Sequence, residues 1–230
     1  MTTVGQVELN PFCRAILAHH FPEAEQHDDV RTTVAWWHSR PRPRVHLVVG
    51  GFPCQPVSTA GRRRGEADER WLWPAMADVI AGLRPDWVLW ENVPGLRTRG
   101  LSTVLADLDR LGYRCRVGTL SACSVGAPHL RQRLFGLAHT YRLARTPPCP
   151  RQVQSHPSAR QCVHRADRRG RAAREHWRTE PRVGRVADGI PARMDRLAAL
   201  GNAVVPAAAE HLGRLILAHH HAIHARPEAA

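Results

Sequence analysis

Apolar residues along this chain fall into short runs that alternate with stretches of helical spacing. The short runs predict strands, one ending at Glu8 and others over residues 46–50, 86–91, 113–120 and 133–138. Helical spacing marks residues 11–20, 71–83, 101–111 and 206–224, the last with a proline in its first turn. Strands that alternate with helices in this way indicate an α/β fold.

Candidate catalytic side chains lie at the ends of the predicted strands. Glu8 and Glu91 each close a strand, and Cys54 follows residues 46–50 within GGFPCQP, where glycines and prolines force an exposed turn. In an open parallel sheet, ligands bind outside the carboxyl ends of the strands, where the following loops converge. The three residues therefore fall where a site is expected.

The charge of the chain changes this picture by indicating a polyanionic partner. Lys and Arg together number 33 against 20 acidic residues, for a net charge of +13, and all 33 are Arg. Residues 142–185 hold twelve Arg and only three acidic residues, which favours binding of nucleic acid, with a solvated basic loop as the alternative. No run approaches the roughly 20 apolar residues that cross a bilayer, and no export signal opens the sequence, so we expect a cytoplasmic protein without a membrane partner.

The thiol of Cys54 is placed for nucleophilic attack if a neighbouring group lowers its pKa. The six cysteines are scattered, which suits reduced thiols better than a disulfide framework. A phosphatase loop would need Arg where Ala60 stands, and a redox pair would need Cys where Val57 stands. A buried structural cysteine remains the alternative.

Glu91 leaves the apolar run WVLW as a carboxyl group that desolvation would turn into a useful acid, although a helix cap or a surface charge would give the same pattern. Further along, HLRQRLF puts Arg131 and Arg133 on one side of an extended segment, where they could grip a phosphate or a base carbonyl. Solvated strand arginines are the alternative here.

Four motifs together carry a resemblance to a known family. GGFPCQPVSTAG, ENVPGL, GAPHLRQRLFGLA and RLAALGNAVVP occur in the order and approximate spacing of the cytosine-5 DNA methyltransferases, and the whole chain resembles that family. GQVELNPFCRAILAHHFPEA and HDDVR are similar to its second and third cofactor-binding stretches. The resemblance implies a Rossmann-like methyltransferase sheet with helices on both faces, S-adenosylmethionine as methyl donor, no metal, and double-stranded DNA as substrate, as in restriction-modification.

The resemblance also implies a mechanism. The target cytosine is flipped out of the duplex, because carbon 6 of a stacked base is out of reach of any side chain. Cys54 attacks carbon 6 while protonated Glu91 hydrogen-bonds ring nitrogen 3. Arg131 and Arg133 would contact the flipped base and position the catalytic loop.

The remaining site residues are assigned by the same resemblance. Cofactor contacts are expected from Glu8 on the ribose hydroxyls, Asp29 and Val30 on the adenine, and Pro53 and Asn202. DNA contacts are expected from the loop over residues 58–70 and its neighbours, namely Gln55, Ser58, Arg62, Arg63, Arg64 and Asn92. His129 stands where the family usually has glutamine.

Three segments are expected: residues 1–140 and 187–230 as the catalytic domain, and residues 141–186 as a short basic target-recognition segment. A zinc site from Cys149, His156, Cys162 and His164 fits no standard spacing, and His219, His220 and His221 are expected simply to sit on the last helix. We expect a monomer.

The family's opening strand and glycine-rich turn, which lie at the centre of its sheet, have no counterpart, because TTVGQVE matches the second strand. We expect the strand ending at Glu8 to lie beside an empty central position or against residues 46–50. A misplaced start codon or a gene fragment explains this better than a permuted gene. The alternative function is therefore a truncated, catalytically impaired DNA-binding remnant.

Overall fold

The computed structural model describes residues 1–53, 71–127, 129–143 and 193–224. The described elements, in chain order, are β1 (Gly5–Val7), α1 (Pro11–His20), β2 (Glu25–His27), η1 (Val30–Thr32), α2 (Thr33–His38), β3 (Leu47–Gly51), α3 (Trp73–Leu83), β4 (Trp87–Asn92), η3 (Pro94–Thr98), α4 (Leu101–Arg110), β5 (Tyr113–Ser121), η4 (Ala122–Val125), β6 (Gln132–Thr140), η5 (Tyr141–Leu143), α7 (Arg193–Asn202) and α8 (Pro206–His224). The expected α/β architecture is confirmed, and the fold is Rossmann-like.

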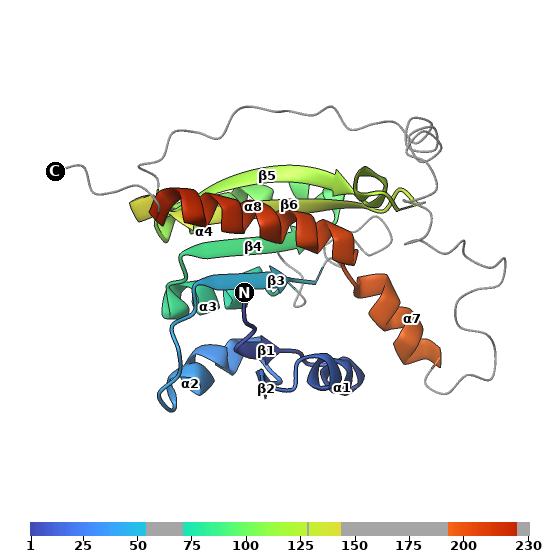
Figure 1. Ribbon diagram of the computed structural model, residues 1–230, viewed down its shortest axis with the longest axis horizontal. Helices are drawn as coiled ribbons and strands as arrows, with labels where there is room; N and C mark the ends of the chain where they lie inside the picture. The colour runs from blue at the N-terminus through green and yellow to red at the C-terminus, as the bar shows by residue number, and fades with distance from the viewer. Residues whose placement is uncertain (54–70, 128, 144–192, 225–230) are drawn as a thin grey trace. The chain divides into compact units, whose positions relative to one another are not determined.

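A four-stranded sheet in the order β3-β4-β6-β5 forms the main body (Figure 1). Strand β3 runs parallel to β4, with Gly51 opposite Glu91. Strand β6 runs antiparallel to β4 and places Phe135 opposite Glu91. The sheet is therefore mixed, and β4 has a partner on both edges.

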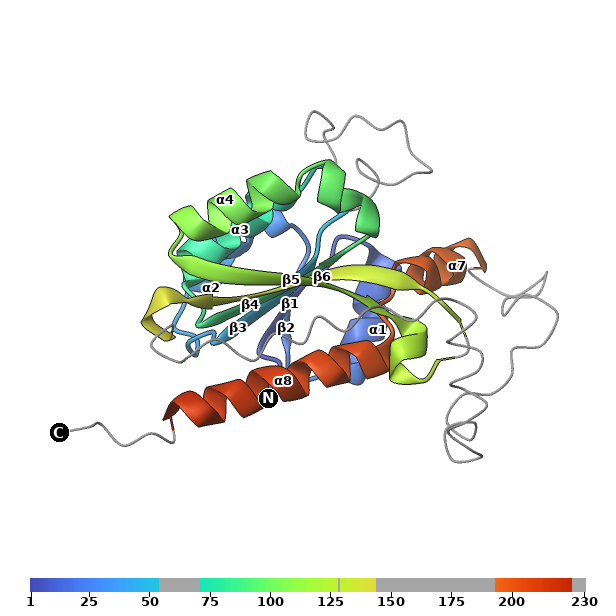
Figure 2. The same cartoon turned by 90° about the horizontal axis from the view of Figure 1, so that it is seen from above.

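Helices α3 and α4 cover one face of this sheet, as Figure 2 shows. The core between them is built largely from side chains of β4, α3 and α4, with Trp73, Trp90, Ile80 and Val104 fully buried. Gly136 on β6 lies directly under the indole of Trp90, and a Cβ there would overlap the ring. Close contact of an indole with backbone is what requires glycine at this position.

A second sheet holds only β1 and β2, which pair in parallel with Val7 opposite His27. Helix α2 contacts α3, where a Cβ on Gly82 would lie 2.6 Å from Cγ1 of Val34. Strand β2 is fixed to the following loop by Arg42, whose buried guanidinium contacts Glu25 at 2.9 Å. The hydrogen bonds from Arg42 and then Arg40 hold the pKa of Glu25 below its usual value.

The two sheets do not join through the described residues. Strand β1 pairs with β2 and not with β3, and β3 pairs with β4. Of the two expected positions for the strand that ends at Glu8, pairing with residues 46–50 is therefore wrong for the described part of the chain. Strands β1 and β3 each carry a ladder partner on one edge only among these residues.

The chain divides into two compact units, residues 1–118 with 133–145, and residues 119–132 with 146–230. The expected basic segment over residues 141–186 lies almost wholly outside the described residues, so the expected domain division stays a prediction. In the second unit, α8 contacts η4.

Among the described helices, none combines the length and apolar character needed to span a membrane.

Candidate active site

The carboxyl end of β4 holds an ion pair between two residues of the expected catalytic set. Nε of Arg133 lies 2.8 Å from Oε1 of Glu91, and their side chains are 21% and 17% exposed. Each side chain leaves a strand with a fixed register, since β4 and β6 are neighbours. A Cβ on Gly51 would lie 3.3 Å from Oε2 of Glu91, so the glycine of β3 gives that carboxyl room. The carboxyl group is thus held in place on both sides.

Arg131, also of the expected catalytic set, contacts the backbone at the end of α7. Its Nη2 donates to the carbonyl oxygens of Gly201 at 2.7 Å and Ala203 at 2.6 Å. Strand β6 begins at Gln132, so Arg131 precedes the strand and the two-residue alternation does not reach it. Arg131 therefore binds carbonyls at the end of α7, where unpaired helix carbonyls favour a cation.

Asn202, an expected cofactor residue, is exposed and stands between the two carbonyls that Arg131 holds. His219, His220 and His221 lie on α8, as expected. The described residues therefore place Arg131 next to the GNAVVP motif.

The loop that follows β3 is described only as far as Pro53, which is half-buried. Phe52 is 6% exposed and packs its ring among Trp71, Trp73 and Trp90. The expected nucleophile and five expected DNA contacts lie outside the described residues, namely Cys54, Gln55, Ser58, Arg62, Arg63 and Arg64.

Asn92, expected to contact DNA, is 1% exposed. Its amide donates to the carbonyl oxygen of Phe52 at 3.1 Å and accepts from the backbone N–H of Val93 at 2.9 Å. Both ends of the amide are thus used inside the protein. Its position within ENV was the only sequence signal, and that signal did not reveal the partner Phe52, which directly follows β3.

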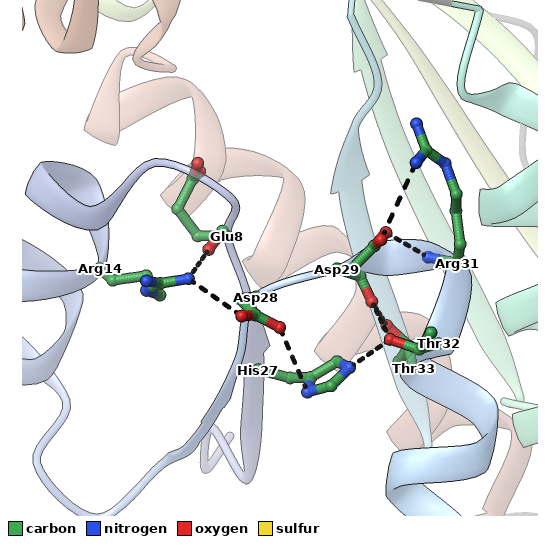
Figure 3. A network of polar contacts seen from close by, with 8 residues as sticks. All are labelled: Glu8, Arg14, His27, Asp28, Asp29, Arg31, Thr32 and Thr33. Atoms are coloured by element: carbon green, nitrogen blue, oxygen red, sulfur yellow. Dashed lines mark hydrogen bonds and ion pairs between the residues drawn. The ribbon is translucent and has the colours of Figure 1, made fainter.

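Two of the expected cofactor residues, Glu8 and Asp29, lie just after β1 and β2 (Figure 3). Glu8 is half-buried, and its Oε1 accepts from the backbone N–H of Asn10 at 2.8 Å. Oδ1 of Asp29 accepts from the backbone N–H of Arg31 at 2.9 Å, which fixes the start of η1. Because β1 and β2 are parallel neighbours, the two carboxylates leave the same edge of one sheet.

A network of polar contacts links the segments that carry Glu8 and Asp29. Arg14 reaches the carbonyl oxygen of Glu8 at 3.4 Å and Oδ2 of Asp28 at 3.8 Å. His27 stacks on Trp36 with ring centroids 4.8 Å apart and contacts Oγ1 of Thr32 at 2.7 Å. Hydroxyl donors such as those of a ribose and the amino group of adenine suit carboxylates at this edge.

The described cysteines outside the expected nucleophile offer little reactivity. Cys13 and Cys115 are free thiols, and desolvation raises the pKa of Cys115 to about 11. Cys123 is half-buried in η4, with its Sγ 3.2 Å from Oγ of Ser121. Within the described ranges no three His, Cys, Asp or Glu side chains gather as a metal site, and Cys149, His156, Cys162 and His164 lie outside those ranges.

The profile of the C-5 cytosine-specific DNA methylase family matches residues 1–168. The chain therefore belongs to this enzyme family. The expected resemblance is confirmed.

Curated relatives agree with this assignment. Type II methyltransferase M2.BsuMI of Bacillus subtilis is 32% identical over 149 residues, which are 61% of this chain and 37% of that protein. Type II methyltransferase M.AgeI of Thalassovita gelatinovora is 39% identical over 116 residues, or 48% of this chain and 27% of that protein. The chain thus matches well under half the length of these relatives.

Solved structures share the fold. A protein described as a DNA modification methyltransferase encoded within an E. coli prophage aligns with a TM-score of 0.50 at 23% identity, over 61% of this chain and 41% of that chain. Methyltransferase EhMeth of Entamoeba histolytica aligns with a TM-score of 0.50 at 17% identity, over 66% of this chain and 47% of that chain.

Proposed function

We propose that this chain transfers a methyl group from S-adenosylmethionine to carbon 5 of cytosine in double-stranded DNA, through a covalent adduct of Cys54 with a flipped base. The observation that carries the proposal is the ion pair of Glu91 and Arg133 at the carboxyl end of β4. That strand pairs with β3, whose continuation leads within three residues of Gly51 to Cys54. An acid, a base-binding cation and a thiol on neighbouring chain segments are the groups that this chemistry needs.

The reaction follows from the roles of these residues. The Cys54 thiolate forms a bond to carbon 6 of cytosine, and the electrons displaced from the 5,6 double bond make carbon 5 nucleophilic. Glu91 keeps Oε1 on Arg133 and, when protonated on Oε2, donates a hydrogen bond to ring nitrogen 3 and stabilises the negative charge that develops there. Arg133 holds the carboxyl group in this orientation and presents a cation to the base.

Bound S-adenosylmethionine supplies the methyl group that carbon 5 takes up. A base then removes the proton from carbon 5, the 5,6 double bond reforms, and Cys54 leaves as thiolate. Because the thiol is restored at the end, one cysteine serves repeated turnovers.

Glu8, Asp29, Val30, Pro53 and Asn202 are the residues that would hold the cofactor. The carboxylates after β1 and β2 fit this role, since each accepts a backbone hydrogen bond through one oxygen and lies at the edge where a ribose and an adenine would present donors. We assign Glu8 to the ribose and Asp29 with Val30 to the adenine.

Arg131 enters this proposal in a changed role. Its contacts with the carbonyls of Gly201 and Ala203 support a function in holding the GNAVVP turn rather than in touching the base. The twelve Arg of residues 142–185 supply the sequence-independent attraction to phosphate.

A second function is favoured by one observation, the lack of pairing between β1 and β3 among the described residues. A cofactor site beside an interrupted sheet would bind S-adenosylmethionine weakly, and the chain would then act as a DNA-binding remnant. Calorimetric titration with S-adenosylmethionine separates the two functions.

The decisive experiment is the variant Cys54→Ser. An alcohol is a far poorer nucleophile than a thiolate at neutral pH, so methylation of DNA should vanish while DNA affinity stays unchanged. Cys13→Ser is the matched control and should keep its methylation. DNA carrying 5-fluorocytosine should form a covalent adduct with the parent chain and none with Cys54→Ser, and undiminished methylation by that variant would disprove the mechanism.

A further inference from the structure

Asn92 is a buried polar residue for which the proposed chemistry has no direct use. It is the last residue of β4, follows Glu91 directly and is 1% exposed. Nδ2 donates to the carbonyl oxygen of Phe52 at 3.1 Å, and Oδ1 accepts from the backbone N–H of Val93 at 2.9 Å. A buried amide with both ends satisfied is expensive to replace, because any change leaves a buried backbone group without its partner.

The orientation of this amide is set by its partners. The carbonyl of Phe52 can only accept, and the N–H of Val93 can only donate. Rotating the amide by half a turn would oppose acceptor to acceptor and donor to donor. The position therefore requires a side chain that donates at one end and accepts at the other, which asparagine does and aspartate does not.

The contact lies where the regular sheet ends. Gly51 opposite Glu91 is the last paired position of β3 and β4, and Pro53 has no N–H with which to continue the ladder. The side chain of Asn92 takes over by binding the carbonyl of Phe52. The ring of Phe52 is fixed as well, with centroids 5.4 Å from those of Trp71 and Trp73.

We propose that Asn92 is a positioning residue that sets the backbone at Phe52, two residues before Cys54, relative to the adjoining Glu91. This inference rests on the proposed function, in which Cys54 and Glu91 act on one base. One buried hydrogen bond then fixes the start of the nucleophile's loop against the residue beside the acid. The role replaces the DNA contact that was expected for Asn92.

The variant Asn92→Asp tests this role by a pH profile. Its carboxylate still accepts from Val93 but repels the carbonyl of Phe52. When protonated, the same group can donate to that carbonyl again. Burial raises the pKa of a carboxyl group, so the activity of the variant relative to the parent should rise as the pH falls from 8 towards 5.5. Misplacement of a reacting group by about 1 Å costs roughly 100-fold in rate, and we expect a loss of about this size at pH 8 with recovery to within roughly tenfold at pH 5.5.

The measured rate is exchange of the hydrogen on carbon 5 of cytosine with solvent. Attack of Cys54 on carbon 6 lets carbon 5 take a solvent proton, and loss of its original hydrogen then releases the thiolate. No methyl donor takes part, so the result does not depend on the cofactor half of the protein. Rates are taken at saturating DNA and corrected for the folded fraction, and the DNA affinity of the variant should match that of the parent.

Two variants serve as controls. Asn10→Asp makes the same chemical change at an exposed residue. The side chain of Asn10 acts there only as an acceptor, through Oδ1, from the N–H groups of Phe12 and Cys13. The exchange rate of this variant should match that of the parent at every pH. Asn92→Ala lacks both hydrogen-bonding groups and should lose exchange without recovery at low pH. A variant with a merely structural defect would show lower stability but a rate per folded molecule that follows the parent's pH profile.

The contact itself is tested without activity. Phenylalanine precedes proline twice in this sequence, at residues 21–22 and 52–53, so labelling carbonyl carbon of Phe and nitrogen of Pro yields two resonance pairs. The Phe52 carbonyl should shift in Asn92→Ala and in Asn92→Asp at pH 8, while that of Phe21 stays in place.

The outcomes separate the two proposals. If the parent chain shows no hydrogen exchange at carbon 5, or if Cys54→Ser still shows it, the proposed function is refuted. Exchange that requires Cys54 but is undiminished in Asn92→Asp at pH 8 would overturn the role of Asn92, as would an unmoved Phe52 carbonyl.

Discussion

The region around β4 and the region around β1 place their functional carboxyl groups by different means. Strand β4 has a partner on both edges, its residues Val88 and Trp90 are fully buried, and Glu91 at its end is 17% exposed and bound to Arg133. Every residue of β1 and β2 is only half-buried, and so is Glu8, which follows β1.

The difference shows how the strand neighbours of a residue determine its preorganisation. Glu91 lies between a glycine of β3 and an arginine of β6, so its position is fixed before any ligand binds. Glu8 and Asp29 are held by short local hydrogen bonds to residues two positions further along the chain. The end of β4 that we propose to act in catalysis is thus preorganised. The end of β1 that we propose to bind the cofactor belongs to a strand with a single ladder partner among the described residues.

Removing the partner of Glu91 should have the largest effect. Arg133→Ala leaves a partly buried carboxyl group without its cation and removes the group that orients it, so methylation should fall roughly 100- to 1,000-fold, as for loss of one preorganised donor. Single-turnover methylation with saturating DNA measures this. Arg97→Ala, on an exposed residue of η3, is the control, and an Arg133→Ala rate within threefold of the parent would contradict the comparison.

The next largest effect is expected on stability, when an added methyl group overpacks the core next to β4. Gly136→Ala forces a Cβ into the indole of Trp90 and should lower the free energy of unfolding by about 3 kcal/mol. Gly118→Ala, on β5, adds a Cβ with no other atom within 4 Å and should change that free energy by less than about 0.5 kcal/mol. Urea denaturation followed by circular dichroism compares the two variants, and equal midpoints would show that the indole of Trp90 can move aside at little cost.

Adding a strand next to β1 should make the β1 region as preorganised as the β4 region. Fusing the first strand and glycine-rich turn of a curated relative ahead of Met1 should tighten S-adenosylmethionine binding about tenfold or more, equivalent to roughly 1.4 kcal/mol. Calorimetric titration of both proteins measures the change, and a fused Gly-Ser segment of equal length is the control. Tight binding by the 230-residue chain without any addition would mean that the interrupted sheet does not limit the cofactor site.

The smallest effect is expected at the open edge of β3. Val49 is 65% exposed, so Val49→Ala should cost no more than about 0.5 kcal/mol. Val88 on β4 is fully buried, and Val88→Ala should cost about 2 kcal/mol for the same chemical change. Thermal unfolding monitors both. If addition of the fused strand makes Val49→Ala costly as well, β3 has gained a neighbour on that edge.

The sequence by itself determined the class of fold and the positions of the candidate catalytic residues along the chain. Runs of apolar residues predicted β3, β4 and β6, because a buried strand needs a local run of hydrophobic residues. Glycines and prolines placed the turn after β3, and the four motifs assigned the family. The three-residue strand β2 and the helix α7 were not expected, since elements this short or this polar leave no clear periodic signal.

Only the tertiary structure decided which side chains meet. Alternation suggested that Arg131 and Arg133 act together, but β6 starts between them, so Arg133 binds Glu91 while Arg131 binds the end of α7. The partner of Asn92, Phe52, lies 40 residues away just after the end of β3, at a distance along the chain that no local pattern encodes. Strand pairing, direction and register bring such residues together, and these are set by long-range packing rather than by the residue sequence around each position.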